Sequence, residues 1–414
     1  MKTIAYNSKS FKYLLWTVLL LTAQRIIVQY FNPIGLVIAI IAFGIFIKHI
    51  LLARKYYSIR NIDKDVRFIT ICLIIWSLIT MFRGIYEGGI MSISHIAQYF
   101  TNAKYIMPYI LPFFAIYAYQ SIDLNLFIRI SRWLTIAFVV YAIISYKELL
   151  ILNTIGLQHF TNTGKNSYTT QLFEFFNLLT SLIAPLVLFL LKSIISKKDW
   201  KYATLNICIA LLVAIIAGRR SSSFAYILVI ISSYFVVFKK SASGTFNLII
   251  LAAIGITIIY QFGFLDFFIS KIGDDSRSGV VENFYDDMDT FSWIFGRGAL
   301  GTYYDPSHNF FDIDGNRTEI ESGYLNMILK GGIIYLALYV IVLAKAFYKG
   351  FYKTNNDFTK AFACICLITC LELIPYGIQS FNLKYLSVWL GVGFCFNQQV
   401  RQMTNTEIKE AFRI

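Results

Sequence analysis

The sequence predicts an all-α polytopic membrane protein with about twelve transmembrane helices. Of its 414 residues, 57% are hydrophobic and 14% are charged, whereas about 25% of the residues in an ordinary soluble domain are charged. Apolar runs of close to 20 residues recur along the whole chain, and a helix of about 20 apolar residues crosses the hydrocarbon core of a bilayer. A soluble fold would need far more polar surface than this composition supplies.

The expected spans follow one another without a separate soluble domain or a convincing repeat, so residues 1–414 form a single integral membrane domain. The first apolar run lacks a convincing small-residue cleavage site, which favours an uncleaved helix over a signal peptide. All six cysteines fall inside expected spans, where they are interpreted as small packing residues and not as a disulfide or zinc pattern. The expected spans are 12–30, 34–53, 67–83, 104–120, 133–150, 172–193, 203–218, 222–238, 246–265, 322–347, 358–377 and 383–398.

The positive charges lie mostly in alternate loops. Of the 37 lysines and arginines, 23 fall on the side of the membrane that holds the N-terminus, 11 fall on the other side and three lie within spans. The positive-inside rule therefore places both termini in the cytoplasm, which agrees with an even number of spans. The net charge of +14 thus indicates membrane orientation and contact with membrane lipids, and we expect no nucleic-acid partner.

A polar loop at residues 266–321, between the ninth and tenth spans, is the largest interruption of the apolar pattern. It contains 12 of the 23 acidic residues, and the predicted topology makes it extracytoplasmic. A membrane protein that concentrates so much polar chain in one place is expected to perform chemistry or recognition there.

Arg219 and Arg220 occupy a short turn that the topology also places outside the cytoplasm, where cations are scarce. They could be interfacial anchors whose side chains extend to lipid headgroups. Guanidinium groups at a helix N-terminus also suit the oxygens of a phosphate. Because the pair opposes the charge trend, we favour the anion site.

The long loop carries further arginines and one histidine. Arg277 precedes a glycine-rich turn that holds Arg297, and Arg317 lies near the end of the loop. Arg277 and Arg297 could bind an anion or could pair with Asp274, Asp286 or Asp305, and both interpretations stay open. His308 is the only histidine of this loop, and a histidine near arginines is a candidate base at neutral pH.

Glu321 stands at the start of the tenth span. A carboxylate there suits a helix N-terminus, and partial desolvation at the membrane boundary would also make it a better base. Lys330 lies nine residues later, roughly 13 Å deeper at a rise of about 1.5 Å per residue. A lysine at that depth must pair or face a polar cavity, and Glu372 is one possible partner.

The chain shows no P-loop, dinucleotide fingerprint or metal-ligand spacing, so we expect no nucleotide, nicotinamide or metal cofactor. The acids of the long loop leave a cation site open as an alternative.

Three segments resemble the superfamily of bacterial O-antigen ligases and Wzy-type polysaccharide polymerases. Gly218-Arg-Arg-Ser-Ser-Ser is similar to the family's Ser-Arg-Gly-small turn, with Arg220 at the arginine position. Arg277 and the later Trp293-Ile-Phe-Gly-Arg-Gly-Ala-Leu-Gly segment resemble the family's arginine and glycine loop. Glu321-Ser-Gly-Tyr-Leu-Asn-Met-Ile-Leu-Lys-Gly-Gly resembles the ligase pattern His-Asn-x-Tyr-Leu, with Tyr324 in step. The ligase histidine is replaced by Glu321, and His308-Asn309 lies 13 residues earlier, so the resemblance favours a polymerase.

The resemblance implies a membrane glycosyltransferase with a GT-C-like fold in the bacterial cytoplasmic membrane. Its substrate would be an undecaprenyl-pyrophosphate-linked glycan, and a polysaccharide chain-length regulator is a further suggested partner. Arg220 and Arg277 would stabilise the leaving pyrophosphate, and Glu321 or His308 would accept the proton of the attacking hydroxyl. An O-antigen ligase and, from another class, a lipid-linked oligosaccharide flippase are the alternatives. The predicted substrate-binding residues are Arg219, Arg297, Arg317, Tyr324 and Lys330.

Overall fold

The computed structural model describes residues 8–27, 32–87, 105–144, 186–216, 220–237, 278–306, 315–320, 322–375 and 379–414. Of these residues, 81% are helical, and two short strands form the one sheet in the part of the chain described. The all-α prediction is therefore confirmed.

Most helices follow the apolar runs of the sequence, with boundaries shifted by a few residues. The α-helices are α1 (Ser8–Ile27), α2 (Asn32–Ala53), α3 (Lys64–Glu87), α5 (Met107–Ile110), α6 (Leu124–Ile144), α10 (Val187–Leu190), α11 (Lys197–Ile216), α12 (Arg220–Val236), α15 (Ser278–Asp287), α16 (Thr290–Phe295), α17 (Gly323–Tyr352), α18 (Asp357–Glu372), α19 (Leu383–Phe396), α20 (Gln398–Gln402) and α21 (Asn405–Phe412). The 3-10 helices are η1 (Arg54–Tyr56), η2 (Ile59–Asn61), η3 (Leu111–Ile116) and η4 (Tyr119–Ser121), and the strands are β1 (Tyr303–Tyr304) and β2 (Asn316–Arg317).

Among the described residues, three helical segments are long and apolar enough to cross a membrane, namely Ile34–Tyr56, Lys64–Arg83 and Gly323–Tyr352. Shorter apolar helices cover Met107–Ile116, Ser222–Val236 and Leu383–Phe396. The expected span 246–265 and most of the span 172–193 lie outside the described residues.

The expected helix at 104–120 differs from the prediction, because it is divided into the short α5 and the 3-10 segment η3. Pro108 and Pro112 stand in the first turn of each piece, and proline lacks the N–H that an uninterrupted helix needs. Beyond η3, Tyr117 forms an isolated antiparallel bridge with Tyr57, which closes this segment against the α2–α3 connection.

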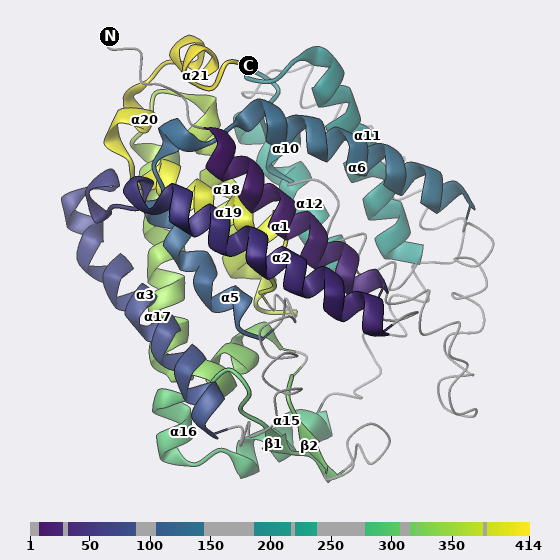
Figure 1. Ribbon diagram of the computed structural model, residues 1–414, viewed down its shortest axis with the longest axis vertical. Coiled ribbons are helices and arrows are strands. Elements are labelled where there is room, and N and C mark those ends of the chain that lie inside the picture. The colour runs from purple at the N-terminus through teal and green to yellow at the C-terminus, as the bar shows by residue number, and fades with distance from the viewer. Residues whose placement is uncertain are drawn as a thin grey trace.

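Helix α17 packs against α3, α16, α18 and α19. Helices α1 and α2 form an adjacent pair, and α12 joins α11 to α18 (Figure 1). The core is dense with aromatic side chains. For example, the ring of Tyr339 on α17 meets that of Trp389 on α19 edge to face at 5.7 Å, and neither side chain is exposed.

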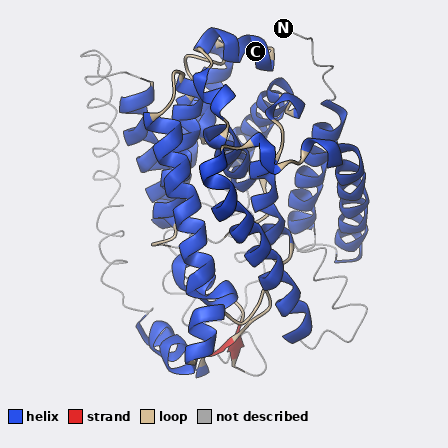
Figure 2. Ribbon diagram, turned by 90° about the vertical axis from the view of Figure 1, so that its left-hand side faces the viewer, coloured by secondary structure: helices blue, strands red, loops and turns tan. Residues whose placement is uncertain are grey.

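The two ends of the bundle carry different parts of the chain. The C-terminus lies at one end together with α20 and α21, whereas α15, α16 and the two strands lie at the opposite end (Figures 1 and 2). The described part of the polar loop is therefore separated from the cation-rich C-terminal segments, as the alternation of charged loops predicts.

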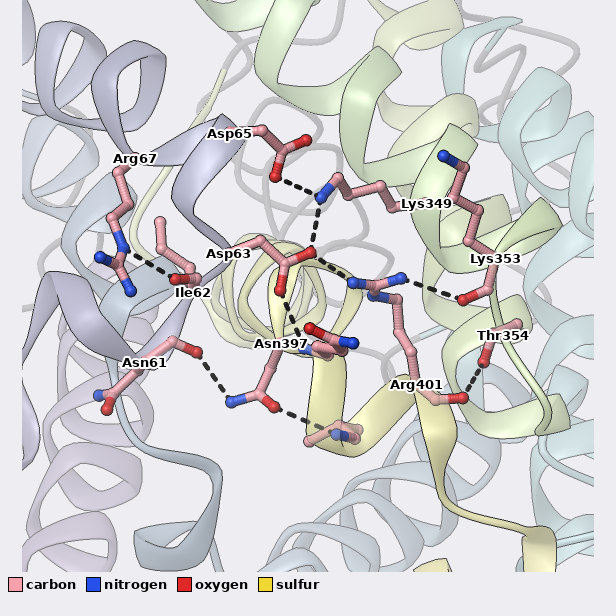
Figure 3. Close-up of polar contacts among 12 residues, drawn as sticks. Asn61, Ile62, Asp63, Asp65, Arg67, Lys349, Lys353, Thr354, Asn397 and Arg401 are labelled. Atoms are coloured by element: carbon pink, nitrogen blue, oxygen red, sulfur yellow. Dashed lines mark hydrogen bonds and ion pairs between the residues drawn. The ribbon is translucent and has the colours of Figure 1, made fainter.

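At the end that holds the C-terminus, Asp63 joins three segments in a cluster that we call the Asp63 clasp (Asp63, Asp65, Lys349 and Arg401; Figure 3). The Asp63 Oδ2 atom accepts hydrogen bonds from Lys349 Nζ at 2.6 Å and from the Arg401 guanidinium. Lys349 Nζ also donates to Asp65 Oδ1 at 2.6 Å. The clasp thus holds the start of α3 against the last turns of α17 and the end of α20.

Candidate functional site

The glycine-rich loop 296–301 docks into a break in α17 at the end opposite the clasp. The break lies at Gly332, whose φ of 72° and ψ of 178° are not helical. Such a break leaves helix carbonyl groups without partners from the following turn. The N–H groups of Arg297 and Gly298 donate to the carbonyl oxygens of Leu329 at 2.7 Å and Lys330 at 2.9 Å. The loop therefore completes the hydrogen bonding that the broken helix lacks.

Glycine is required on both sides of this contact. Gly296 and Gly332 both have φ values near +70°, a conformation that other residues rarely adopt. A Cβ atom on Gly332 would lie 2.0 Å from the carbonyl oxygen of Ile294, and one on Gly296 would lie 2.4 Å from that of Lys330. Loop and helix thus approach to a distance that leaves no room for a side chain.

Helix α3 supports the junction from the side. The indole Nε1 of Trp76 donates to the carbonyl oxygen of Gly331 at 2.7 Å. The Arg83 guanidinium donates to the carbonyl oxygens of Phe295 and Gly296, both at 2.9 Å. Three segments that are distant in sequence therefore hold one another's backbone in place.

Arg297 and Arg317 are paired with aspartates. The Arg297 guanidinium forms an ion pair with Asp287 and donates to the Thr302 carbonyl oxygen at 2.8 Å. Arg317 Nη1 lies 2.9 Å from Oδ2 of Asp305, which is fully buried. Of the two interpretations drawn from the sequence, the structure therefore shows acid pairing for Arg297. Its partner is Asp287, which is none of the three acids named there. A direct contact of either arginine with substrate stays a prediction.

Lys330 meets the expectation that a lysine at this depth must pair or face a polar cavity, because it does both. Its Nζ donates to the Gly301 carbonyl oxygen at 2.8 Å, and its side chain lines a cavity. The suggested partner Glu372 was wrong, since Glu372 Oε1 instead accepts a hydrogen bond from Lys384 Nζ at 2.6 Å. Lys384 begins α19 directly beside the end of α18, and this proximity decides the pairing.

The cavity beside Lys330 has a volume of about 40 Å³ and is partly open to solvent. Polar groups reach it from the end of the loop, from α17 and from the segment before α19, namely Thr318, Glu319, Asn326, Lys330 and Gln379. The Oδ1 atom of Asn326 is buried and has no hydrogen-bond partner among the described residues. A buried acceptor left in this state is costly, so the cavity is suited to a ligand that donates a hydrogen bond to it.

Glu319 is a residue that the sequence analysis did not single out. It lies two positions before Glu321, in the same acidic stretch, and its charge acts on Lys330 across the cavity. The acidic composition of the loop indicates that a carboxylate of this stretch could contact α17. Which carboxylate does so depends on the direction of the side chains, which the sequence does not show.

The remaining predicted residues fall largely outside the described part of the chain. Arg220 is the first residue of α12, but its side chain is not described. Arg219, Arg277, His308 and Glu321 lie outside the described residues. Tyr324 lies in the first turn of α17, where its N–H donates to the Leu373 carbonyl oxygen at 3.1 Å and its side chain is partly exposed.

Within the described ranges, no group of three or more histidine, cysteine, aspartate or glutamate side chains is arranged to hold a metal ion. No known family model matches the chain, and no curated protein matches it either.

Proposed function

We propose that the protein is a membrane glycosyltransferase that polymerises undecaprenyl-pyrophosphate-linked oligosaccharide repeat units into O-antigen or capsular polysaccharide. The reaction would take place at the outer face of the bacterial cytoplasmic membrane, with both termini in the cytoplasm and about twelve spans in a GT-C-like arrangement. The observation that carries the proposal is the polar cavity between the long loop and the broken helix α17, at the end of the bundle away from the C-terminus. The resemblance of the flanking motifs to the ligase and polymerase superfamily supports it.

In the proposed reaction, a sugar hydroxyl of the acceptor attacks the anomeric carbon of the donor. The carbon–oxygen bond to the pyrophosphate breaks, and the configuration at that carbon is inverted. Arg220, with Arg219 and Arg277, would stabilise the negative charge that develops on the leaving pyrophosphate, a role that a preorganised cation can fill. Glu321 or His308 would accept the proton of the hydroxyl.

The ligase alternative differs in the acceptor, which would be a lipid A core and not a second lipid-linked repeat. The ligase pattern has histidine where this chain has Glu321, which favours the polymerase. A polysaccharide chain-length regulator is a proposed partner of the polymerase.

A flippase would need polar and charged groups along a central path through both leaflets, and Lys48 and Lys330 are the residues of this sequence that favour it. Lys330 is engaged by Gly301 of the long loop, and Lys48 Nζ lies 4.5 Å from the ring centroid of Tyr13. The contact with Gly301 ties the buried Lys330 to the long loop, which supports the enzyme over the transporter, whereas Lys48 is exposed on α2.

The test is elongation of a lipid-linked repeat by purified protein in lipid nanodiscs, where transport between compartments is impossible. We expect a ladder of longer glycans, and we expect Arg220→Ala and Glu321→Gln to abolish it. Arg129→Ala and Glu410→Gln, which change exposed residues of the same types, serve as matched controls and should leave the ladder intact. If Arg220→Ala and Glu321→Gln both elongate normally at equal protein levels, the assigned roles are wrong.

A further inference from the structure

Helix α16 and the glycine-rich loop 296–301 are attached to the apolar part of α3. On α3, the last charged residue before the apolar run is Arg67, and the run begins at Phe68. At about 1.5 Å per residue, Trp76 and Arg83 lie roughly 12 Å and 22 Å beyond Phe68, and both therefore fall within a hydrocarbon core of about 30 Å. These two side chains donate hydrogen bonds to the junction between the loop and α17, so the junction reaches the same depth.

The large side chains that α16 exposes are apolar. Phe291 is 59% exposed and Ile294 is 39% exposed, and exposed apolar surfaces of this kind mark contacts with a protein or a membrane. The Arg83 guanidinium lies 5.6 Å from the centroid of the Phe291 ring. The ring of Phe295 stacks on that of Trp76 at 6.0 Å. The exposed side of α16 therefore stands beside the last turns of α3 (Figure 1).

An apolar face of α3 is continuous with this surface. Large exposed side chains recur along α3 every three or four residues, which is the spacing of one helix face. They are Phe68, Ile71, Ile75, Ile79 and Phe82. Because α3 is long and apolar enough to cross a membrane, this face is the one that lipid covers. Phe291 extends the same apolar surface beyond the last turn of α3.

The backbone of the loop is hydrogen-bonded in the way that burial in a membrane requires. Irregular backbone at membrane depth is tolerated only where protein groups satisfy its N–H and C=O groups. The carbonyl oxygens of Phe295 and Gly296 accept from Arg83, and that of Gly301 accepts from Lys330 Nζ. The N–H groups that donate to backbone carbonyl oxygens are those of Gly296, Arg297, Gly298, Ala299 and Gly301. The two cations are thereby engaged with carbonyl groups, as charged side chains within a membrane are.

We infer that residues 290–301 form a re-entrant wedge, which enters the membrane beside α3 and presents Phe291 and Ile294 to the acyl chains of phospholipids. The wedge begins in water at the exposed Asp289, whose side chain caps α16. Its glycine-rich end is held inside the bundle by α3 and α17. Part of the long polar loop therefore lies within the membrane and not in the aqueous space beside it. The inference does not depend on the proposed function, because contact with lipid requires no chemistry.

Photocrosslinking tests the wedge with the full-length protein in phospholipid nanodiscs. The photoreactive amino acid p-benzoylphenylalanine (Bpa) replaces one aromatic residue at a time, and the mass of the irradiated protein shows what it has captured. We expect Phe291→Bpa to capture phospholipid as efficiently as Phe82→Bpa, the positive control on α3. Tyr304→Bpa is the matched control, because Tyr304 is 51% exposed but lies opposite the exposed Asn316 in the two-stranded sheet. It should capture at least tenfold less phospholipid.

Thiol labelling gives a second measurement that does not require Bpa. A charged, membrane-impermeant maleimide should react at least tenfold more slowly with Ile294→Cys than with Tyr304→Cys, each rate being measured against the wild-type protein. The inference is overturned if Phe291→Bpa captures no phospholipid or captures a second copy of the chain, or if the two thiols react equally fast. It is also overturned if Phe82→Bpa captures none, because α3 then has no lipid-facing side at this depth. Lipid capture at Phe291 in a protein that does not elongate lipid-linked glycan would refute the proposed function and leave the wedge standing.

Discussion

The junction between loop 296–301 and α17 predicts that Gly332→Ala destabilises the protein strongly. Alanine would have to adopt a backbone conformation reserved for glycine, which costs about 1–3 kcal/mol. Its Cβ atom would also stand 2.0 Å from the Ile294 carbonyl oxygen, so the loop would have to withdraw. Withdrawal would break the two hydrogen bonds from the loop to α17, each with a net contribution of about 0.5–1.5 kcal/mol. The expected loss in the free energy of unfolding is therefore about 2–6 kcal/mol.

Thermal unfolding of the purified protein measures this loss. Cys364, Cys366 and Cys395 are buried free thiols, so a thiol-reactive fluorophore reports the temperature at which they become accessible. We expect the Tm of Gly332→Ala to fall by about 2–7 °C, since an unfolding entropy of about 2.1 cal/mol/K per residue makes 1 kcal/mol correspond to roughly 1 °C in a chain of 414 residues.

Gly44→Ala is the matched control, because a Cβ atom on Gly44 of α2 meets nothing within 4 Å. Alanine in a helix interior is favoured over glycine by roughly 0.5–1 kcal/mol, so this variant should melt at or slightly above the wild-type temperature. A Gly332→Ala protein with wild-type Tm would refute the reasoning, as would an equal loss in both variants.

Three further predictions concern charged side chains. Asp63→Asn should lower the free energy of unfolding by about 3–5 kcal/mol, as expected when one partner of a buried ion pair is removed. The double variant Asp63→Asn/Lys349→Met should have a higher Tm than Asp63→Asn alone. Lys384→Met should lower the free energy of unfolding by a similar amount, because it leaves the buried carboxylate of Glu372 without its cation. Adding Glu372→Gln should restore much of the lost Tm in the same melting assay. The pKa of Asp289 is held below its ordinary value by hydrogen bonds from Ser292, so its cap on α16 contributes stability above about pH 4 that is lost as the pH falls through the lowered pKa. Limited proteolysis between pH 7 and 3 should therefore show a pH-dependent opening near residues 290–295 in the wild type that is absent in Asp289→Asn, whose cap does not titrate.

The long helices could be predicted from the sequence because a run of apolar residues determines a membrane helix locally. The spans expected at 34–53, 67–83 and 322–347 correspond to α2, α3 and α17. The segment 104–120 has the same composition, but Pro108 and Pro112 remove donors at two points and divide the helix. The positions of these two prolines make the interruption predictable from the sequence in principle.

The site was less predictable because its contacts join residues that are distant in sequence. Gly331 and Gly332 suggest a break in α17 from the sequence alone. The sequence does not show that loop 296–301 supplies the hydrogen bonds that the break leaves unmade, because the loop and the helix are brought together only by the fold. Several acids lie near Arg297 in the sequence. The turn between α15 and α16 brings Asp287, and not another of these acids, into an ion pair with it. The importance of Glu319 likewise depends on the direction of one side chain in a loop.

The Asp63 clasp has a consequence for the biosynthesis of the protein. Asp63 is separated by 286 residues from Lys349 and by 338 from Arg401. At about 5–20 residues per second of translation, the carboxylate of Asp63 waits roughly 15 to 70 seconds for both partners. Helix α3 must therefore persist without this contact until α17 and α20 have been synthesised. Chains that terminate before Arg401 lack this closing contact, so Asp63 is then held through Lys349 alone within the clasp.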